Sequence, residues 1–232
     1  MKNECCAIIT ARGGSKRIPN KNIKLFNGKP IISYSINAAL ESELFEEVIV
    51  STDSSEIENV SLTYGAKVPF RRSSRNSDDF STTSDVLIEV LENLRNIGRK
   101  YKYICCIYPT APMITVNNLK KGLELMLSDS YDSVFPVTEF SAPILRSFNL
   151  NSHGKLEYNW PEFKNHRSQD IVKSYFDAGQ FYWINVEKFL LNKSIVSLNS
   201  GGIILSQLDV QDIDNLEDWA MAELKYRFKY SL

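Results

Sequence analysis

The chain of 232 residues contains only two histidines, His153 and His166, and its four cysteines show no C-x-x-C spacing. A structural zinc site needs about four His or Cys ligands at close spacing, so the sequence argues against one. The cysteines stand instead in two adjacent pairs, Cys5-Cys6 and Cys105-Cys106, each inside an apolar run. We therefore expect buried thiols in a reducing compartment rather than disulfides.

The sequence also lacks an excess of charge and a long apolar segment. Its 27 basic and 28 acidic residues give a net charge of −1, which argues against broad attraction to nucleic acid or membranes. No apolar run approaches the length that spans a bilayer. Arg12 follows the first short apolar run at once, unlike a signal peptide. We expect a cytoplasmic protein that binds neither nucleic acid nor membrane.

Two common phosphate-binding motifs are missing. There is no G-x-x-x-x-G-K-[ST] loop and no G-x-G-x-x-G loop, and the second absence removes the main support for a nicotinamide oxidoreductase.

What the chain has in their place is a basic loop, residues 11–22, directly after the apolar run that ends at Thr10. Gly13 and Gly14 allow backbone N–H groups to turn inward, and the cations Arg12, Lys16, Arg17 and Lys21 supply positive charge. The loop therefore predicts a site for a polyphosphate. The alternative is a solvated basic turn.

Short β-rich runs alternate with amphipathic helical stretches along the chain, which predicts an α/β fold with a largely parallel sheet covered on both faces. Expected strands lie near residues 7–10, 48–50, 68–70, 103–108, 133–137, 181–184 and 203–205. Expected helices lie near residues 30–40, 119–127 and 216–228. Another is expected to begin after a cap at Asp53 or Ser54, and one more to run from Thr82 or Thr83 to about residue 94. We expect one domain over residues 1–232, interrupted at about 140–176 by an irregular insertion that covers a site or forms a partner surface.

Asp212 and Asp214 stand two residues apart near the end of the chain. In extended backbone both carboxylates point to the same side, where they can bind Mg²⁺ against phosphate oxygens. Asp214 and Glu217 also fit a capping box for the last helix. From their spacing alone, both interpretations remain open.

Three other features are ambiguous on their own. Tyr108-Pro109-Thr110-Ala111-Pro112 predicts a rigid turn at the end of a strand. Arg71 lies in a polar loop and can be solvated there. Arg167 can bind a carboxylate in a bidentate manner or form a surface salt bridge.

Together and in this order, these segments resemble the CMP-sugar synthetases, the acylneuraminate cytidylyltransferase family. The resemblance runs from Ala7 to about Trp219, and its most specific element is Ala11–Lys16 with Pro19, Lys21 and Asn22. Within the family, four further segments most resemble the members that act on pseudaminic acid: residues 105–112, 135–140, 177–183 and 210–214. N-acetylneuraminate enzymes carry glutamine at the position of Tyr108, so this residue favours a differently substituted sugar.

The resemblance implies a three-layer α/β/α Rossmann-like nucleotidyltransferase domain with a mostly parallel mixed sheet and a protruding dimerisation element, hence a homodimer. It implies that CTP and a nine-carbon acidic 2-keto sugar, pseudaminic acid, give a CMP-sugar and pyrophosphate with Mg²⁺, for glycosylation of surface glycans or flagellin. The alternatives are CMP-N-acetylneuraminate, CMP-legionaminate or Kdo synthesis, or a non-catalytic nucleotide-binding sensor.

The resemblance also implies roles for individual residues. The nucleotide would be bound by Ala11, Arg12, Gly13, Gly14, Ser15, Lys16, Lys21, Asn22, Arg71 and Thr82. The catalytic residues would be Arg12, Lys21, Asn22, Asp212 and Asp214, of which the two aspartates would bind the metal. The sugar would contact Tyr108, Arg167 and Gln180. No general base is evident, and metal-assisted deprotonation of the sugar hydroxyl is the expected substitute.

Overall fold

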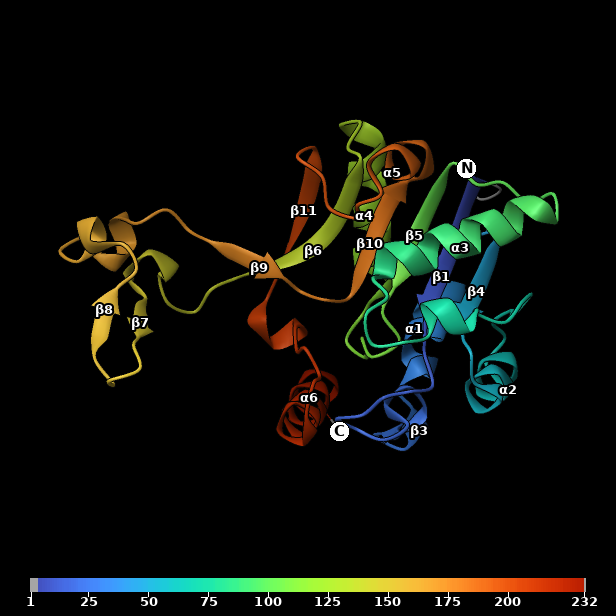
Figure 1. The fold of residues 1–232 in the computed structure, drawn as a ribbon, viewed down its shortest axis with the longest axis horizontal. Helices are drawn as coiled ribbons and strands as arrows, with labels where there is room; N and C mark the ends of the chain where they lie inside the picture. Colours follow the sequence, from blue (N-terminus) through green and yellow to red (C-terminus); the bar gives the residue numbers. More distant parts are fainter. Residues whose placement is uncertain (1–3, 232) are drawn as a thin grey trace.

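The structure, a computed structural model that describes residues 4–231, is built around a seven-stranded mixed sheet (Figure 1). The strand order is β11-β6-β10-β5-β1-β4, with β9 paired to β6. β10 runs antiparallel to both β5 and β6, while β1, β4 and β5 are parallel to one another. The strands are β1 (Cys5–Thr10), β4 (Glu47–Ser51), β5 (Tyr103–Ile107), β6 (Ser133–Glu139), β9 (Tyr175–Asp177), β10 (Phe181–Asn185) and β11 (Ser200–Leu205).

Helices cover both faces of this sheet, which confirms the predicted three-layer α/β/α arrangement. Alternate residues of β1 face opposite sides, so that Ala7 and Ile9 pack with α1, α2 and α4, and Cys6 and Ile8 pack with α3 and α5. All four cysteines are buried and free, as the sequence predicts. The helices are α1 (Ile32–Ser42), α2 (Ser55–Thr63), α3 (Thr83–Asn96), α4 (Val116–Ser128), α5 (Val186–Asn192) and α6 (Leu216–Tyr230).

The carboxyl ends of the parallel strands lie at one edge of the sheet. Ile9 of β1 pairs with Ile107 of β5, and Thr10 pairs with Ser51 of β4. The antiparallel β10 begins at this same edge, where Phe181 pairs with Ile107. The basic loop, the turn after β4, the turn after β5 and the turn before β10 therefore meet at one place.

The end of the chain returns to this edge through a small hydrophobic cluster. Phe26, from the hairpin of β2 (Leu25–Phe26) and β3 (Lys29–Pro30), packs edge to face on Trp219 of α6 at 5.7 Å between ring centroids. Ile18 of the basic loop and Ile213 are buried in the same cluster. This cluster places the residues just before α6 beside the basic loop, although about 200 positions separate them in the sequence.

Between β6 and β9 the chain forms a projecting segment, residues 140–174, that leaves the body of the molecule (Figure 1). It contains the hairpin of β7 (Phe148–Leu150) and β8 (Leu156–Tyr158) and several single turns of 3₁₀ helix. Its apolar side chains Leu150, Leu156 and Val172 are exposed. The segment lies within the predicted insertion at 140–176, and its dimerisation role stays a prediction. Residues 1–3 and 232 of the predicted domain lie outside the described residues.

Some expected elements differ from the structure. The strand expected at 68–70 is wrong, because only a single bridge between Ile49 and Lys67 forms there and Pro69 has no N–H to continue the pairing. α1 begins at Ile32, since Pro30 belongs to β3. Among residues 4–231, no helix combines the length and the apolar character needed to cross a membrane.

Candidate active site

The basic loop is anchored to the end of β4. The backbone N–H of Ala11 donates to the Ser51 carbonyl at 2.9 Å, and that of Gly13 donates to Asp53 Oδ1 at 2.8 Å. A Cβ atom on Gly13 would lie 3.0 Å from Cβ of Ser54, so this close approach favours glycine. The Gly13 amide thus binds a carboxylate of the protein, while Gly14 borders open space.

Three cations of the loop pair with carboxylates from distant parts of the chain. Arg12 Nη1 lies 2.8 Å from Asp79 Oδ1, and Lys16 Nζ binds the other oxygen of the same carboxylate. Arg17 Nη1 lies 2.8 Å from Asp214 Oδ2. These pairs place protein carboxylates where the sequence predicts phosphate groups.

Asn22 is buried and Lys21 is partly buried. Lys21 Nζ donates to the carbonyl of Ile213 at 2.7 Å. Ile213 is the residue between the two aspartates. Burial lowers the pKa of Lys21, and the nearby carboxylates of Asp214 and Asp212 counter this effect. Asn22 Nδ2 donates to the Arg12 carbonyl at 2.9 Å, so this amide supports the loop itself.

The residue that caps α6 is Asn215, not Asp214. Asn215 Oδ1 accepts hydrogen bonds from the backbone N–H groups of Glu217 and Asp218, and Asp218 Oδ2 accepts from the N–H of Asn215 in return. Asp218 Oδ2 also accepts from the N–H of Asp214 at 2.9 Å. Of the two interpretations that the spacing left open, the capping box of Asp214 and Glu217 does not form, and the Asp214 carboxylate pairs with Arg17 instead.

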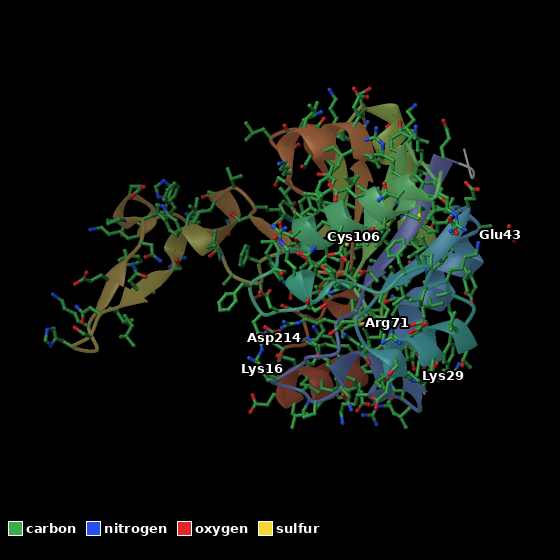
Figure 2. The ribbon with its side chains drawn as sticks, turned by 45° about the vertical axis from the view of Figure 1, so that its right-hand side comes forward. Lys16, Lys29, Glu43, Arg71, Cys106 and Asp214 are labelled. Atoms are coloured by element: carbon green, nitrogen blue, oxygen red, sulfur yellow. The ribbon has the colours of Figure 1, made fainter. Side chains whose placement is uncertain are left out.

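A cavity of about 230 Å³ joins these parts of the chain. Its walls come from the basic loop, from residues 108–110 after β5, and from Asp214. Lys16 and Asp214 lie on the same side of the molecule in Figure 2. A larger cavity of about 610 Å³ adjoins it and contains both Asp212 and Asp214, with Phe140 and Phe176 in its wall. Asp214 therefore borders both spaces.

The two aspartates suit a divalent cation whose coordination shell is completed by a substrate. Burial and the neighbouring Asp214 raise the pKa of Asp212, so a positive charge beside this carboxylate would be favourable. Within residues 4–231, no cluster of three His, Cys, Asp or Glu side chains could hold a metal by itself. Two carboxylates supply part of an oxygen shell whose other ligands would be phosphate oxygens and water.

Arg71 and Thr82 lie outside the lining of the smaller cavity. Arg71 Nη2 binds Glu58 Oε2 at 2.5 Å, and Thr82 caps α3 in a capping box with Asp85. The neighbour Arg72, which the sequence alone allows to be solvated, is instead buried and donates to Ser51 through Nε at 3.1 Å and Nη2 at 2.6 Å. Arg72 therefore supports the end of β4, and its only sequence signal is its position beside Arg71.

The three expected sugar-binding residues are dispersed. Tyr108 lines the smaller cavity and packs on Tyr182, with 5.4 Å between ring centroids. Gln180 is 3% exposed and donates to the carbonyl of Asp209 at 2.6 Å, so it supports the chain leading to Asp212. Arg167 is exposed on the projecting segment and lines neither of the two cavities described above.

The cation-rich loop after β1 and Asp214 border one cavity at the carboxyl ends of the parallel strands, which is where open α/β sheets bind their ligands. The fold is shared with a CMP:2-keto-3-deoxy-manno-octonic acid synthetase solved in complex with CTP, at a TM-score of 0.69 and 16% identity over 99% of this chain and 100% of that one. The chain belongs to the cytidylyltransferase family, whose model matches residues 6–195. It is therefore a CTP-dependent nucleotidyltransferase.

Two curated relatives match nearly the full length. Pseudaminic acid cytidylyltransferase of Campylobacter jejuni is 41% identical over 99% of this chain and 98% of its own length. CMP-N,N'-diacetyllegionaminic acid synthase of Legionella pneumophila is 32% identical over 94% of each chain.

Proposed function

We propose that this enzyme transfers the cytidylyl group of CTP to pseudaminic acid, giving the CMP-sugar and pyrophosphate. The observation that supports this proposal is the cavity in which the basic loop faces Asp214, because cations that would bind a triphosphate lie there beside an acid that would bind the metal. The 41% identity to the Campylobacter jejuni pseudaminic acid enzyme supports the sugar. The product would serve glycosylation of surface glycans or flagellin, from a cytoplasmic enzyme.

In the reaction, the anomeric oxygen of the sugar attacks the α-phosphorus in line with the leaving group. The bond from phosphorus to the bridging oxygen of the β-phosphate breaks, pyrophosphate departs and the hydroxyl proton is released. Such a transfer depends on positioning and charge neutralisation more than on covalent help from the protein.

The cations of the basic loop bind the triphosphate by exchanging partners. Lys21 carries three N–H donors and uses one on the Ile213 carbonyl, so two remain for a phosphate at the acid-lined end of the cavity. Arg12 and Lys16 meet the β- and γ-phosphates after they release Asp79. Asn22 orients this array by holding the Arg12 carbonyl.

Asp212 and Asp214 would hold Mg²⁺, which offsets negative charge on the phosphates when bound. The protein prepares this place by holding both polar groups of the peptide bond between Ile213 and Asp214. Lys21 binds the carbonyl of Ile213, and Asp218 binds the N–H of Asp214.

Base selection rests on Arg71 and Thr82. A guanidinium that donates to O2 and N3 of cytosine disfavours uracil, which carries a proton on N3. Arg71 donates to Glu58 in the structure, so binding of the base requires it to turn toward the nucleotide.

The sugar lies beside Tyr108 and extends into the larger cavity next to the two aspartates. Gln180 acts on it indirectly, through the carbonyl of Asp209. Arg167 is exposed and lines neither cavity of its own chain, so it would bind the sugar carboxylate in a second subunit. This proposal makes the enzyme a homodimer joined through the projecting segment.

A panel of sugars tests the substrate. Purified enzyme is incubated with CTP, Mg²⁺ and pseudaminic acid, N,N'-diacetyllegionaminic acid, N-acetylneuraminic acid or Kdo, and pyrophosphate release is measured. We expect the highest kcat/KM with pseudaminic acid. A higher value with the legionaminic acid derivative would assign that sugar instead, and release with none of them would favour a nucleotide sensor.

A further inference from the structure

Asp79 is the one carboxylate that binds two cations of the basic loop at once, among the residues that the structure describes. Its Oδ1 binds Arg12 at 2.8 Å and its Oδ2 binds Lys16. The carbonyl of Asp78 accepts a further hydrogen bond from Arg12 Nη1 at 2.6 Å. Asp79 belongs to the segment between α2 and α3, and the mechanism above requires only that Arg12 and Lys16 release it.

The turn that presents Asp79 is held by its neighbour. Asp78 Oδ1 accepts hydrogen bonds from the N–H of Ser81 at 2.7 Å and from the N–H of Phe80 at 3.0 Å. Phe80 itself is 90% exposed, so no buried side chain ties this turn to the basic loop. Polar contacts to Arg12 and Lys16 make the connection, and such contacts at a wet surface exchange readily.

The Asp79 carboxylate reproduces the chemistry of a phosphate group at this place. Two oxygens of one anion span the same two cations that a β- or γ-phosphate would need. Hydrogen bonds from Lys16 and Arg12 lower the pKa of Asp79, so this carboxylate is ionised at neutral pH. A polyphosphate at Arg12 and Lys16 therefore competes with Asp79 for the donors that this carboxylate uses, and it meets the repulsion of the Asp79 charge.

We propose that Asp79 is an internal competitor of the pyrophosphate moiety, which weakens binding of CTP and pyrophosphate and takes their place on Arg12 and Lys16 as pyrophosphate leaves. This inference rests on the proposed function, since it assumes that the two cations bind the β- and γ-phosphates. It predicts selectivity by chain length. CMP, whose single phosphate lies near Lys21, does not compete with Asp79.

The matched variants are Asp79→Asn and Asp78→Asn. Both remove one negative charge from adjacent positions, but only Asp79 touches the two cations through its side chain. Dissociation constants for pyrophosphate and CMP are measured by calorimetry. We expect Asp79→Asn to tighten pyrophosphate binding about threefold to tenfold, with the CMP constant unchanged, and Asp78→Asn to change neither by more than about twofold.

Equal pyrophosphate affinity in Asp79→Asn and the parent enzyme would overturn the inference. Equal tightening in Asp79→Asn and Asp78→Asn would also overturn it, because the effect would then come from the change in net charge and not from the contact with Arg12 and Lys16. A second variant pair tests the route. In a Lys16→Met background, Asp79→Asn should lose most of its effect, and a full effect there would also contradict the proposal. If the parent enzyme forms no CMP-sugar, the proposed function is wrong. If the parent enzyme is active but Asp79→Asn leaves pyrophosphate affinity unchanged, only this inference is wrong.

Discussion

Each of the four basic side chains of the loop binds an oxygen of the protein in the structure. Arg12 and Lys16 share Asp79, Arg17 pairs with Asp214, and Lys21 donates to a carbonyl. The proposed binding of a triphosphate would therefore exchange the partners of Arg12 and Lys16, so its net free energy would be smaller than the number of cations suggests.

Lys21 is the cation for which the structure predicts the largest catalytic effect. Its ammonium lies between the loop and the aspartates and is more buried than that of Lys16. Lys21→Ala should lower kcat/KM by roughly 10²- to 10³-fold, because it removes charge stabilisation next to the reacting phosphate. Lys24→Ala, on the same turn but outside the cavity lining, is the control. A variant with near-normal turnover and an unchanged melting temperature would contradict this role.

At this scale the sequence predicted which cations gather in one loop but not their partners in the folded chain. The glycine pair and the cations lie together in sequence, so a phosphate site could be inferred from local chemistry. Asp79 lies 67 residues from Arg12 and Gln180 lies 29 from Asp209, and only the folded chain brings each pair into contact.

At the scale of elements, the start of α6 assigns helix capping and the proposed metal binding to different residues, which sequence analysis could not do. Asn215 and Asp218 form the cap, which leaves Asp214 to face the two cavities. The ambiguity arose because Asp, Asn and Glu all suit a helix N-terminus, and one-residue shifts of a capping box cannot be resolved from spacing.

A pair of variants separates these roles experimentally. Asn215→Ala should lower stability by about 1 kcal/mol, because two N–H groups of the first turn lose their acceptor. Asp214→Asn should leave stability within about 0.5 kcal/mol of the parent and reduce activity strongly. Urea denaturation and pyrophosphate release give the two values. A large loss of stability in Asp214→Asn would restore the capping interpretation.

The sheet shows what alternation of strands and helices can predict. The strands near 48–50 and 103–108 were identified because their residues are continuously apolar, as in the buried β4 and β5. The antiparallel direction of β10 could not be inferred, since Phe181–Asn185 would be equally apolar in either direction. That direction matters, because it brings Gln180 to the edge where the site lies.

At the scale of the whole molecule, a buried carboxylate links separate parts of the fold. Glu47 on β4 accepts hydrogen bonds from Tyr101, from Lys67 at 3.1 Å and from Arg99 at 2.8 Å. Burial alone would raise the pKa of Glu47, but the hydrogen bonds and charges of these partners outweigh it and lower the pKa below its ordinary value.

This lowered pKa predicts a pH dependence of stability. A carboxyl whose pKa is lower in the folded than in the unfolded state contributes stability above the unfolded value, and the contribution is lost as the pH falls through the folded value. Glu47→Gln should therefore destabilise the protein at pH 7 by about 1–3 kcal/mol and by less at pH 3. Thermal unfolding across this pH range is the measurement. A destabilisation that is constant with pH would contradict the account.

The projecting segment is the largest feature that physical reasoning from sequence left undefined. Its irregular composition indicated an interruption between residues 140 and 176, and the structure forms a hairpin there whose apolar side chains face solvent. Sequence patterns describe how a chain buries its own apolar residues, and Leu150 and Leu156 are not buried by their own chain.

The central claim is that the basic loop and the aspartates before α6 bind one CTP molecule. A crystal structure with CTP and Mg²⁺ tests it most directly, through the position of the triphosphate. We predict phosphate oxygens within hydrogen-bonding distance of Arg12 and Lys21, and a metal ion that joins the same triphosphate to Asp212 and Asp214. A triphosphate that contacts the loop while both aspartates remain remote from it would contradict the account.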